Sequence, residues 1–150
     1  MITIRPSAVD APEAVALVRF YLTEMVDRYY GRPMPVSVVD QALAEEPADD
    51  VAVLLVAYQE GVAVGCVGLR EPGEITKMYV APPARRLGLA RRLLAAVEDA
   101  ARERGLRTLR LDTRKDLVEA RSLYASCGYQ EIPPPYERQY ADHWFTKTLG

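Results

Sequence analysis

The sequence contains few of the residues from which metal sites and disulfide frameworks are built. Its two cysteines, Cys66 and Cys127, and its one histidine, His143, do not lie at metal-ligand spacing from one another. A zinc site or a disulfide framework is therefore not expected, and we predict that the protein binds no metal. Cysteines that form neither a metal site nor a disulfide are typically buried, reduced thiols. Such thiols are typical of cytoplasmic proteins, so we predict a cytoplasmic location.

Long apolar runs and a large net charge are also missing. No segment reaches the roughly 18 apolar residues of a membrane helix, so we expect no membrane partner. The net charge of −2 gives no electrostatic reason to expect binding to nucleic acid. Of the 19 basic residues 16 are arginine, so local cationic sites are built mainly from guanidinium groups, which suit phosphate and carboxylate.

The composition that is present, 49% hydrophobic and 27% charged over 150 residues, fits one domain spanning residues 1–150. β-rich runs predict strands, and 3.6-residue periodicity predicts helices. Strands are expected at 2–5, in a hairpin around Gln59-Glu60-Gly61, and at 74–80, 106–113, 129–132 and 143–149. Helices are expected from a capping box at Asp10 and Glu13 to Gly31, from the cap Ser37 to residue 46, at 89–104 and at 116–127. This order predicts an α/β (α+β) fold with a mixed sheet.

The segment RRLGLARRLL, residues 85–94, places one glycine and four arginines at the start of a helix. The first helical turn leaves unpaired N–H groups at the positive end of the helix dipole. Gly88 and the small Ala90 let a ligand approach this backbone closely, and a phosphate is the natural partner. From these residues alone two interpretations stay open, an anion site and a solvated helix start.

This segment also resembles a known family. Arg85-x-x-Gly88-x-Ala90, after a strand ending at Val80, is similar to the acetyl-CoA pyrophosphate loop of the GNAT superfamily of N-acetyltransferases, which reads Gln/Arg-x-x-Gly-x-Gly/Ala. The later segment EARSLYASCGYQEI resembles the family's A-x-x-L-Y-x-x-x-G-F/Y stretch, and the element order fits over essentially all 150 residues. The resemblance implies a three-layer GNAT-like fold, with a mixed central sheet of about six to seven strands flanked by about four helices. The sheet is expected to splay between two parallel central strands, Glu74–Val80 and Arg107–Asp112.

The resemblance implies acetyl-CoA as cosubstrate. Its pantetheine arm is expected to enter the splayed gap and pair with strand backbone, where the Val80 N–H can polarise the thioester carbonyl. The pyrophosphate is expected on the N–H groups of residues 86–90. The cofactor-binding residues that this implies are Met78, Tyr79, Val80, Arg85, Arg86, Leu87, Gly88, Leu89, Ala90 and Arg91.

Two catalytic residues follow from the same resemblance. Tyr124 occupies the position of the tyrosine that protonates the departing thiolate in many members, and Glu74 is the candidate general base that deprotonates the amine. In a regular strand residues 74, 76, 78 and 80 share one face, so Glu74 can point into the cleft. Both residues also have plain structural interpretations, a core aromatic and a strand-edge carboxylate. At Leu117 many relatives carry an asparagine that contacts the cofactor, so we expect this contact to be lost or moved to Arg114 or Arg121.

The acceptor is expected between the first two helices and the last hairpin. Candidate substrate-binding residues are Tyr29, Tyr30 and Arg32 on one side, and Tyr136, Arg138 and Tyr140 on the other. We predict acetyl transfer to a primary amine of a small molecule by direct attack in a ternary complex. The alternatives are a protein or peptide N-acetyltransferase and a non-catalytic acyl-CoA-binding sensor module. Trp144 and Phe145 suggest core or dimer packing, and a homodimer stays open.

Overall fold

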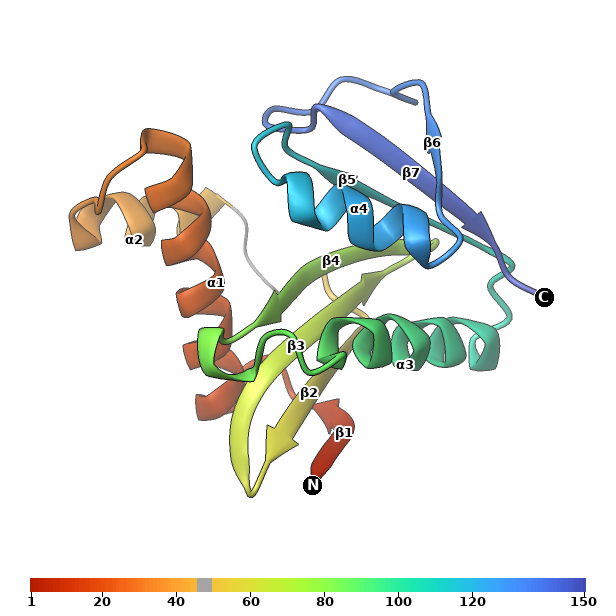
Figure 1. The fold of residues 1–150 in the computed structure, drawn as a ribbon, viewed down its shortest axis with the longest axis horizontal. Coiled ribbons are helices and arrows are strands. Elements are labelled where there is room, and N and C mark those ends of the chain that lie inside the picture. Colours follow the sequence, from red (N-terminus) through yellow and green to blue (C-terminus); the bar gives the residue numbers. More distant parts are fainter. Residues whose placement is uncertain (46–49) are drawn as a thin grey trace.

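A seven-stranded mixed sheet runs through the molecule, and helices cover both of its faces (Figure 1). This computed structural model describes residues 1–45 and 50–150. In these ranges the strands are β1 (Ile2–Ser7), β2 (Val53–Gln59), β3 (Val62–Arg70), β4 (Glu74–Val80), β5 (Thr108–Thr113), β6 (Gln130–Ile132) and β7 (His143–Thr148). The helices are α1 (Pro12–Tyr30), α2 (Val36–Glu45), α3 (Leu89–Glu103) and α4 (Val118–Ser126), and a short 3-10 turn, η1 (Pro82–Ala84), precedes α3. The predicted fold class and the order of the helices and strands are confirmed.

The sheet opens at its centre. Its strand order is β1-β2-β3-β4-β5-β7-β6, and every neighbouring pair is antiparallel except β4 and β5, which are parallel. Within the described part of the chain, β4 and β5 pair in register only at Glu74 and Arg110, where the Arg110 N–H donates to the Gly73 carbonyl at 2.9 Å. Beyond this point the two strands diverge (Figure 1), which is the expected splay.

A bulge in β4 accompanies the divergence. Lys77 has a positive φ of 55°, and the register with β3 shifts there, since Gly68 pairs with Thr76 but Cys66 pairs with Tyr79. A bulge bends a strand and reverses which residues face which side. Met78 and Val80 therefore pack with the α3-side core, whereas Tyr79 packs with α1. Our prediction that residues 74, 76, 78 and 80 share one face is wrong for this reason.

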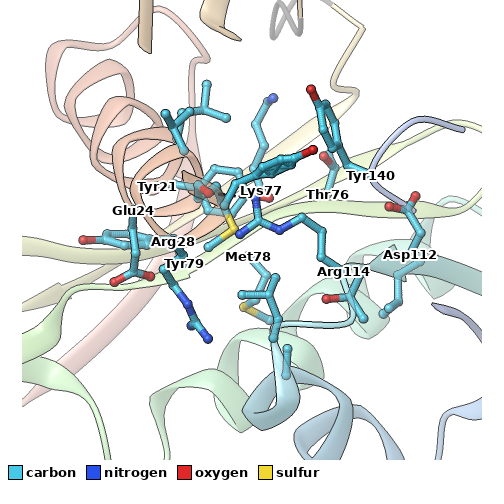
Figure 2. A pocket seen from close by; sticks show the side chains of 18 of the residues that line it. Tyr21, Glu24, Arg28, Thr76, Lys77, Met78, Tyr79, Asp112, Arg114 and Tyr140 are labelled. Atoms are coloured by element: carbon cyan, nitrogen blue, oxygen red, sulfur yellow. Dashed lines mark hydrogen bonds between the residues drawn. The ribbon is translucent and has the colours of Figure 1, made fainter. Parts of the chain in front are cut away.

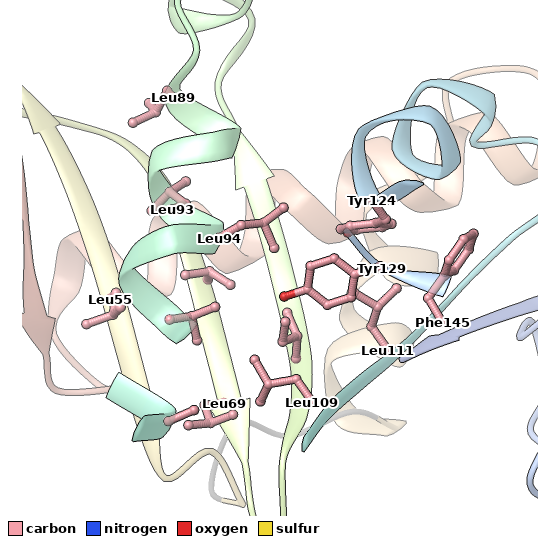
Figure 3. Close-up of a cluster of buried hydrophobic side chains, with 14 of the residues drawn as sticks. Leu55, Leu69, Leu89, Leu93, Leu94, Leu109, Leu111, Tyr124, Tyr129 and Phe145 are labelled. Carbon is pink, nitrogen blue, oxygen red and sulfur yellow. The ribbon is translucent and has the colours of Figure 1, made fainter. Parts of the chain in front are cut away.

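The larger core lies between the sheet and α3 (Figure 3). The helix buries the apolar face that its periodicity predicts, made of Leu89, Leu93, Leu94, Val97 and Ala101. Burying each leucine contributes about 1.5–3 kcal/mol relative to exposure. Phe145 belongs to this core and Trp144 is 1% exposed, so both residues pack inside the chain.

Gly65 lets α3 approach β3, because a Cβ there would lie 2.8 Å from the Tyr79 carbonyl oxygen and 3.3 Å from the Leu93 side chain. This close contact sets the start of α3 against the end of β4. The position of the segment that follows Val80 is thus fixed by packing rather than by the loop alone.

Some helix boundaries differ from expectation. The N-cap of α1 is Ala11 without a side-chain cap, so the capping box at Asp10 and Glu13 does not form, and Pro12 begins the helix instead. Helix α2 begins at Val36, which places Ser37 inside its first turn. Residue 46, where this helix was expected to end, lies outside the described residues.

Two further features bear on the predicted absences. No helix in the described ranges combines the length and the apolarity that a membrane crossing requires. Across residues 1–45 and 50–150, no three His, Cys, Asp or Glu side chains group in a way that could hold a metal ion. The thiol of Cys66 is buried and donates to the Lys77 carbonyl at 3.2 Å, and Cys127 is a free, half-buried thiol.

Candidate active site

A cleft of about 830 Å³ opens where β4 and β5 part. Side chains from α1, β4 and β5 converge on it (Figure 2), and α4 and the segment between β6 and β7 complete its lining. We divide the lining into two parts. The edge half consists of Met78, Val80, Arg85, Ala90 and Tyr124, and the loop half consists of Tyr29, Glu74, Asp112, Arg138 and Tyr140.

The edge half presents unpaired strand backbone to the cleft. The Ala81 N–H bonds to the Val64 carbonyl of β3 at 2.8 Å. Because backbone groups of successive strand residues point to opposite sides, the Val80 N–H and carbonyl face the open edge. The Val80 carbonyl accepts a hydrogen bond from Arg85 Nε at 2.8 Å. The Val80 N–H is thus positioned to donate to an extended ligand that lies in the gap.

The start of α3 lies beside this edge. Gly88 is its N-cap, with φ 75° and no side-chain cap, and Arg86 also has a positive φ of 66°. Inside the helix the Arg92 N–H bonds to the Gly88 carbonyl, so the N–H groups before it in the first turn lack helical partners. A Cβ at Gly88 would meet no atom within 4 Å, which shows open space over the backbone. These residues fit a phosphate, whose charge the helix dipole also favours.

Two of the three predicted arginine side chains are already engaged. Arg85 pairs with Glu24 of α1 at 2.5 Å, in addition to its bond to Val80. Arg91 donates to Ser126 Oγ at 2.8 Å and lies 3.5 Å from Cys127 Sγ, which connects α3 to α4. Arg86 is exposed at the mouth of the helix. The backbone N–H groups are therefore the groups left open at this helix start, while the Arg85 and Arg91 side chains hold neighbouring elements in place.

Tyr124 lies on α4 and lines the cleft with its ring held on several sides. It is 7% exposed, and its ring centroid lies 6.0 Å from both Tyr129 and Phe145. Burial, with a smaller contribution from the charge of Asp112, raises the pKa of the Tyr124 hydroxyl well above its usual range. The phenol therefore stays protonated at neutral pH, as a hydrogen-bond donor must.

Glu74 lines the cleft at the point where β4 and β5 meet, and it is 5% exposed. Arg138 donates to both of its oxygens, Nη1 to Oε1 at 2.5 Å and Nη2 to Oε2 at 3.1 Å. Arg70 donates to Oε1 at 3.1 Å, and the Tyr136 hydroxyl donates to Oε2 at 3.3 Å. Burial raises the pKa of this carboxyl, but hydrogen bonding and charge from Arg138, with Arg70 and Tyr136, lower it by more. Glu74 is thus an ionised, fully engaged carboxylate.

The loop half also contains an aromatic rim. Tyr29 packs edge-on against Tyr30 at 5.1 Å and against Tyr140 at 5.0 Å, measured between ring centroids. All three tyrosines line the cleft and are about half exposed. Of the other predicted substrate residues, Arg138 lines the cleft, whereas Arg32 and Tyr136 do not, although the Tyr136 hydroxyl reaches Glu74.

The structure brings together most of the predicted site. The cleft lining includes Tyr29, Tyr30, Glu74, Met78, Tyr79, Val80, Arg85, Ala90 and Tyr124. The remaining predicted cofactor residues lie in the adjoining loop and first turn of α3, where the Leu89 side chain is in the core and only its backbone is available. Leu117 lines the cleft, while Arg114 is bonded to Asp116 and to the Met25 carbonyl.

Sequence reasoning missed Asp112 and Glu24, which both line the cleft. Asp112 had a usable signal, because polar residues at the carboxyl end of a parallel strand often face a ligand site. Glu24 had no sequence signal, since it lies within the amphipathic helix α1, where a glutamate is ordinary.

The comparisons with known proteins agree with this geometry. The acetyltransferase (GNAT) family model matches residues 16–129. An IAA acetyltransferase of Azospirillum brasilense is 34% identical over 137 residues, which cover 85% of this chain and 86% of that protein. An aminoglycoside N(6')-acetyltransferase type 1 of Stenotrophomonas maltophilia is 30% identical over 109 residues, covering 65% and 69% respectively.

Solved structures agree on the fold. A GNAT-family acetyltransferase of Staphylococcus aureus Mu50 superposes with a TM-score of 0.78 at 17% identity, over 100% of both chains. A PaiA N-acetyltransferase of Thermoplasma acidophilum, solved in complex with coenzyme A, gives a TM-score of 0.75 at 16% identity, over 99% of both chains.

Proposed function

This chain belongs to the GNAT family of acetyltransferases, and on that premise we propose that it transfers the acetyl group of acetyl-CoA to a primary amine of a small molecule. One observation carries the proposal. A single cleft joins the unpaired edge of β4, the start of α3 and the ring of Tyr124. These supply a place for an extended arm, for its phosphates and for a proton donor near the reacting end.

In this proposal the pantetheine arm lies along Met78, Tyr79 and Val80 as an additional strand, because its amides match a strand's hydrogen-bonding groups. The pyrophosphate lies on the N–H groups of residues 86–90, where Gly88 leaves the backbone open. The Val80 N–H faces the thioester carbonyl and stabilises the oxyanion that forms there.

The chemical step is a direct attack within a ternary complex. The amine nitrogen forms a bond to the acetyl carbon, the carbon–sulfur bond breaks, and the electron pair leaves on the CoA sulfur. The Tyr124 hydroxyl donates a hydrogen bond and then a proton to this thiolate. An alkylamine is protonated at neutral pH, so it first loses one proton to a base or to water before it attacks. The attacking nitrogen then loses a second proton, which passes through water to the Tyr124 phenolate and restores the phenol.

Glu74 remains the proposed base only under one condition. Four hydrogen bonds from Arg70, Tyr136 and Arg138 engage its oxygens. A carboxylate held in this way has a lowered pKa and is a weak proton acceptor. For Glu74 to deprotonate the amine, Arg138 has to leave it; otherwise a water molecule takes this role.

The acceptor side favours a small amine. The aromatic rim of Tyr29, Tyr30 and Tyr140 gives apolar faces to a small molecule. The neighbouring arginines are already paired, Arg28 with Glu119 and Arg114 with Asp116. The aminoglycoside acetyltransferase among the relatives also carries the name of a small-molecule acceptor, which supports the same class.

Isothermal titration calorimetry with acetyl-CoA, followed by measurement of CoA release with amines, amino acids and peptides, tests the proposal. Binding with turnover of small amines is the expected result. Turnover of peptides alone would place the chain among protein acetyltransferases, and binding without any turnover would indicate a sensor module. Absence of binding would mean that residues 85–90 form only a helix start.

A further inference from the structure

We propose that Arg138 is a positioning residue for acetyl transfer, because it holds the segment between β6 and β7 against the point where β4 and β5 part. We call this segment, residues 133–142, the proline loop. Its fixed position forms the acceptor side of the cleft. The kinetic part of this inference rests on the function proposed above, whereas its structural part does not.

The guanidinium of Arg138 bridges both central strands. Its Nη1 atom lies 2.5 Å from Glu74 Oε1 on β4 and 2.7 Å from Asp112 Oδ2 on β5. Its Nη2 atom donates to Glu74 Oε2 at 3.1 Å. The two strands share a single register pair, at Glu74 and Arg110, so the bridge lies at the junction from which they diverge. Arginine suits this task because its planar fork can bind two carboxylates at once.

The same guanidinium lies over two aromatic rings. Its carbon lies 5.2 Å from the Trp144 ring centroid and 5.1 Å from that of Tyr136, and these two rings pack edge-on at 5.0 Å. Trp144 is buried, so the stacked position is fixed by the core. A charge held by two carboxylates and by two ring faces has little freedom to reorient, so Glu74 stays engaged with Arg138 and the amine proton passes to water.

Arg138 supplies the charged attachment of an otherwise exposed loop. Within residues 133–140 every residue is exposed except Arg138. At the far end the Asp142 N–H bonds to the Thr113 carbonyl, and its side chain accepts from the Lys115 N–H. Residues 136–140 are thus held by the charged bonds of Arg138 together with Tyr136, whose hydroxyl reaches Glu74, while three prolines at 133–135 stiffen the approach.

The residues next to Arg138 reach across the cleft. The Ala141 N–H bonds to the Arg138 carbonyl, and inside this turn Tyr140 takes a positive φ of 68°. A tyrosine in this conformation is strained and persists only when its surroundings hold it. Its ring packs on Tyr29 of α1 at 5.0 Å, which closes the rim of the cleft. Arg138 therefore determines where Tyr140 lies, and Tyr140 faces the acceptor.

Hydrogen–deuterium exchange of the proline loop is the first test. Arg138→Met removes the charge and the fork but keeps an unbranched apolar stem. We expect the amides of Ala141 and Asp142, which bond to the Arg138 and Thr113 carbonyls, to exchange about tenfold or more faster once the loop loses its charge-assisted hydrogen bonds. Arg138→Lys should recover only part of the protection of these amides from exchange, because an ammonium group lacks the planar fork of a guanidinium that binds two carboxylates. Arg102→Met is the matched control, since Arg102 bonds to Asp99 and Gly150 away from the cleft. Unchanged exchange in Arg138→Met would overturn the proposal.

A double variant separates positioning from general destabilisation. If Arg138 acts through Glu74, then Glu74→Gln should speed exchange of the loop, and combining it with Arg138→Met should add little further effect. If the two changes destabilised the loop independently, their effects on its exchange rate would instead multiply. Multiplied effects of the two changes would therefore contradict the proposed coupling.

Kinetics provide the functional readout. With the panel amine that the wild type turns over fastest, Arg138→Met should raise KM about tenfold, with kcat changed less than about threefold and acetyl-CoA affinity unchanged. A loss of acetyl-CoA affinity would contradict the assignment of Arg138 to the acceptor side. If the wild type acetylates no amine of the panel, the proposed function fails, and the exchange measurements still decide whether Arg138 holds the loop.

Discussion

The two halves of the cleft are built in different ways. Apart from Tyr124, the edge half is formed by nearly consecutive residues, from Met78 to Ala90, and these offer mainly backbone groups. The loop half is formed by side chains from α1, β4, β5 and the proline loop, and charged hydrogen bonds hold it together. Backbone groups recognise features common to every CoA ester, whereas side chains can differ from one acceptor to another. The first half is therefore suited to a constant cosubstrate and the second to a particular substrate.

The largest effect should come from Gly88→Glu in the edge half. Gly88 has φ 75°, and its backbone faces open space, so a glutamate would add strain, bulk and negative charge at the phosphate position. We expect acetyl-CoA affinity to fall by about a hundredfold or more, as measured by calorimetry.

Gly88→Asn is the control for this variant, because asparagine tolerates the left-handed conformation and carries no charge. It should keep most of the affinity. A folded Gly88→Glu protein with wild-type affinity would remove residues 86–90 from the cofactor site.

Tyr124→Phe should give the next largest effect, on kcat rather than on binding. The ring stays packed between Tyr129 and Phe145 while the proton donor is removed. We expect kcat to fall about a hundredfold with acetyl-CoA affinity nearly unchanged. Tyr129→Phe is the matched control, since it removes a buried hydroxyl that bonds Glu98 at 2.9 Å and should cost stability but not kcat. An unchanged kcat in Tyr124→Phe would exclude Tyr124 as the essential acid.

The same contrast between the halves explains what the sequence could predict. The apolar face of α3 and the glycine at its start are local patterns, so the fold and the position of residues 85–90 followed from short stretches. The bulge at Lys77 was missed, because no sequence signal marks a lysine with positive φ. The Arg138–Glu74 pair was missed because 64 residues separate its members, and only the folded sheet brings them together.

A change of intermediate size is expected for Glu74→Gln, and it should depend on pH. The folded-state pKa of Glu74 is lowered, so the carboxylate contributes stability that is complete above its unfolded pKa of about 4.3 and is lost as pH falls through the folded value. The variant should be about 1–3 kcal/mol less stable at pH 7, with a difference from the wild type that shrinks below about pH 4.

Urea unfolding at pH 7, 5, 4 and 3 measures this dependence. A difference that does not change with pH would mean that the ion pairs of Glu74 contribute nothing to stability. The same variant tests the base hypothesis, because Glu74→Gln that keeps kcat would assign the amine proton to water.

The smallest effects should distinguish residues on the rim from residues beside it. Tyr29 lines the cleft and packs on Tyr140 at 5.0 Å, so Tyr29→Ala removes an aromatic contact and should raise the acceptor KM about threefold to tenfold. Arg32 follows the end of α1, is exposed and does not line the cleft, so Arg32→Ala should change KM less than about twofold. Steady-state kinetics with one amine compares the two variants directly. A larger effect for Arg32→Ala than for Tyr29→Ala would move the acceptor site away from the rim and toward the segment between α1 and α2.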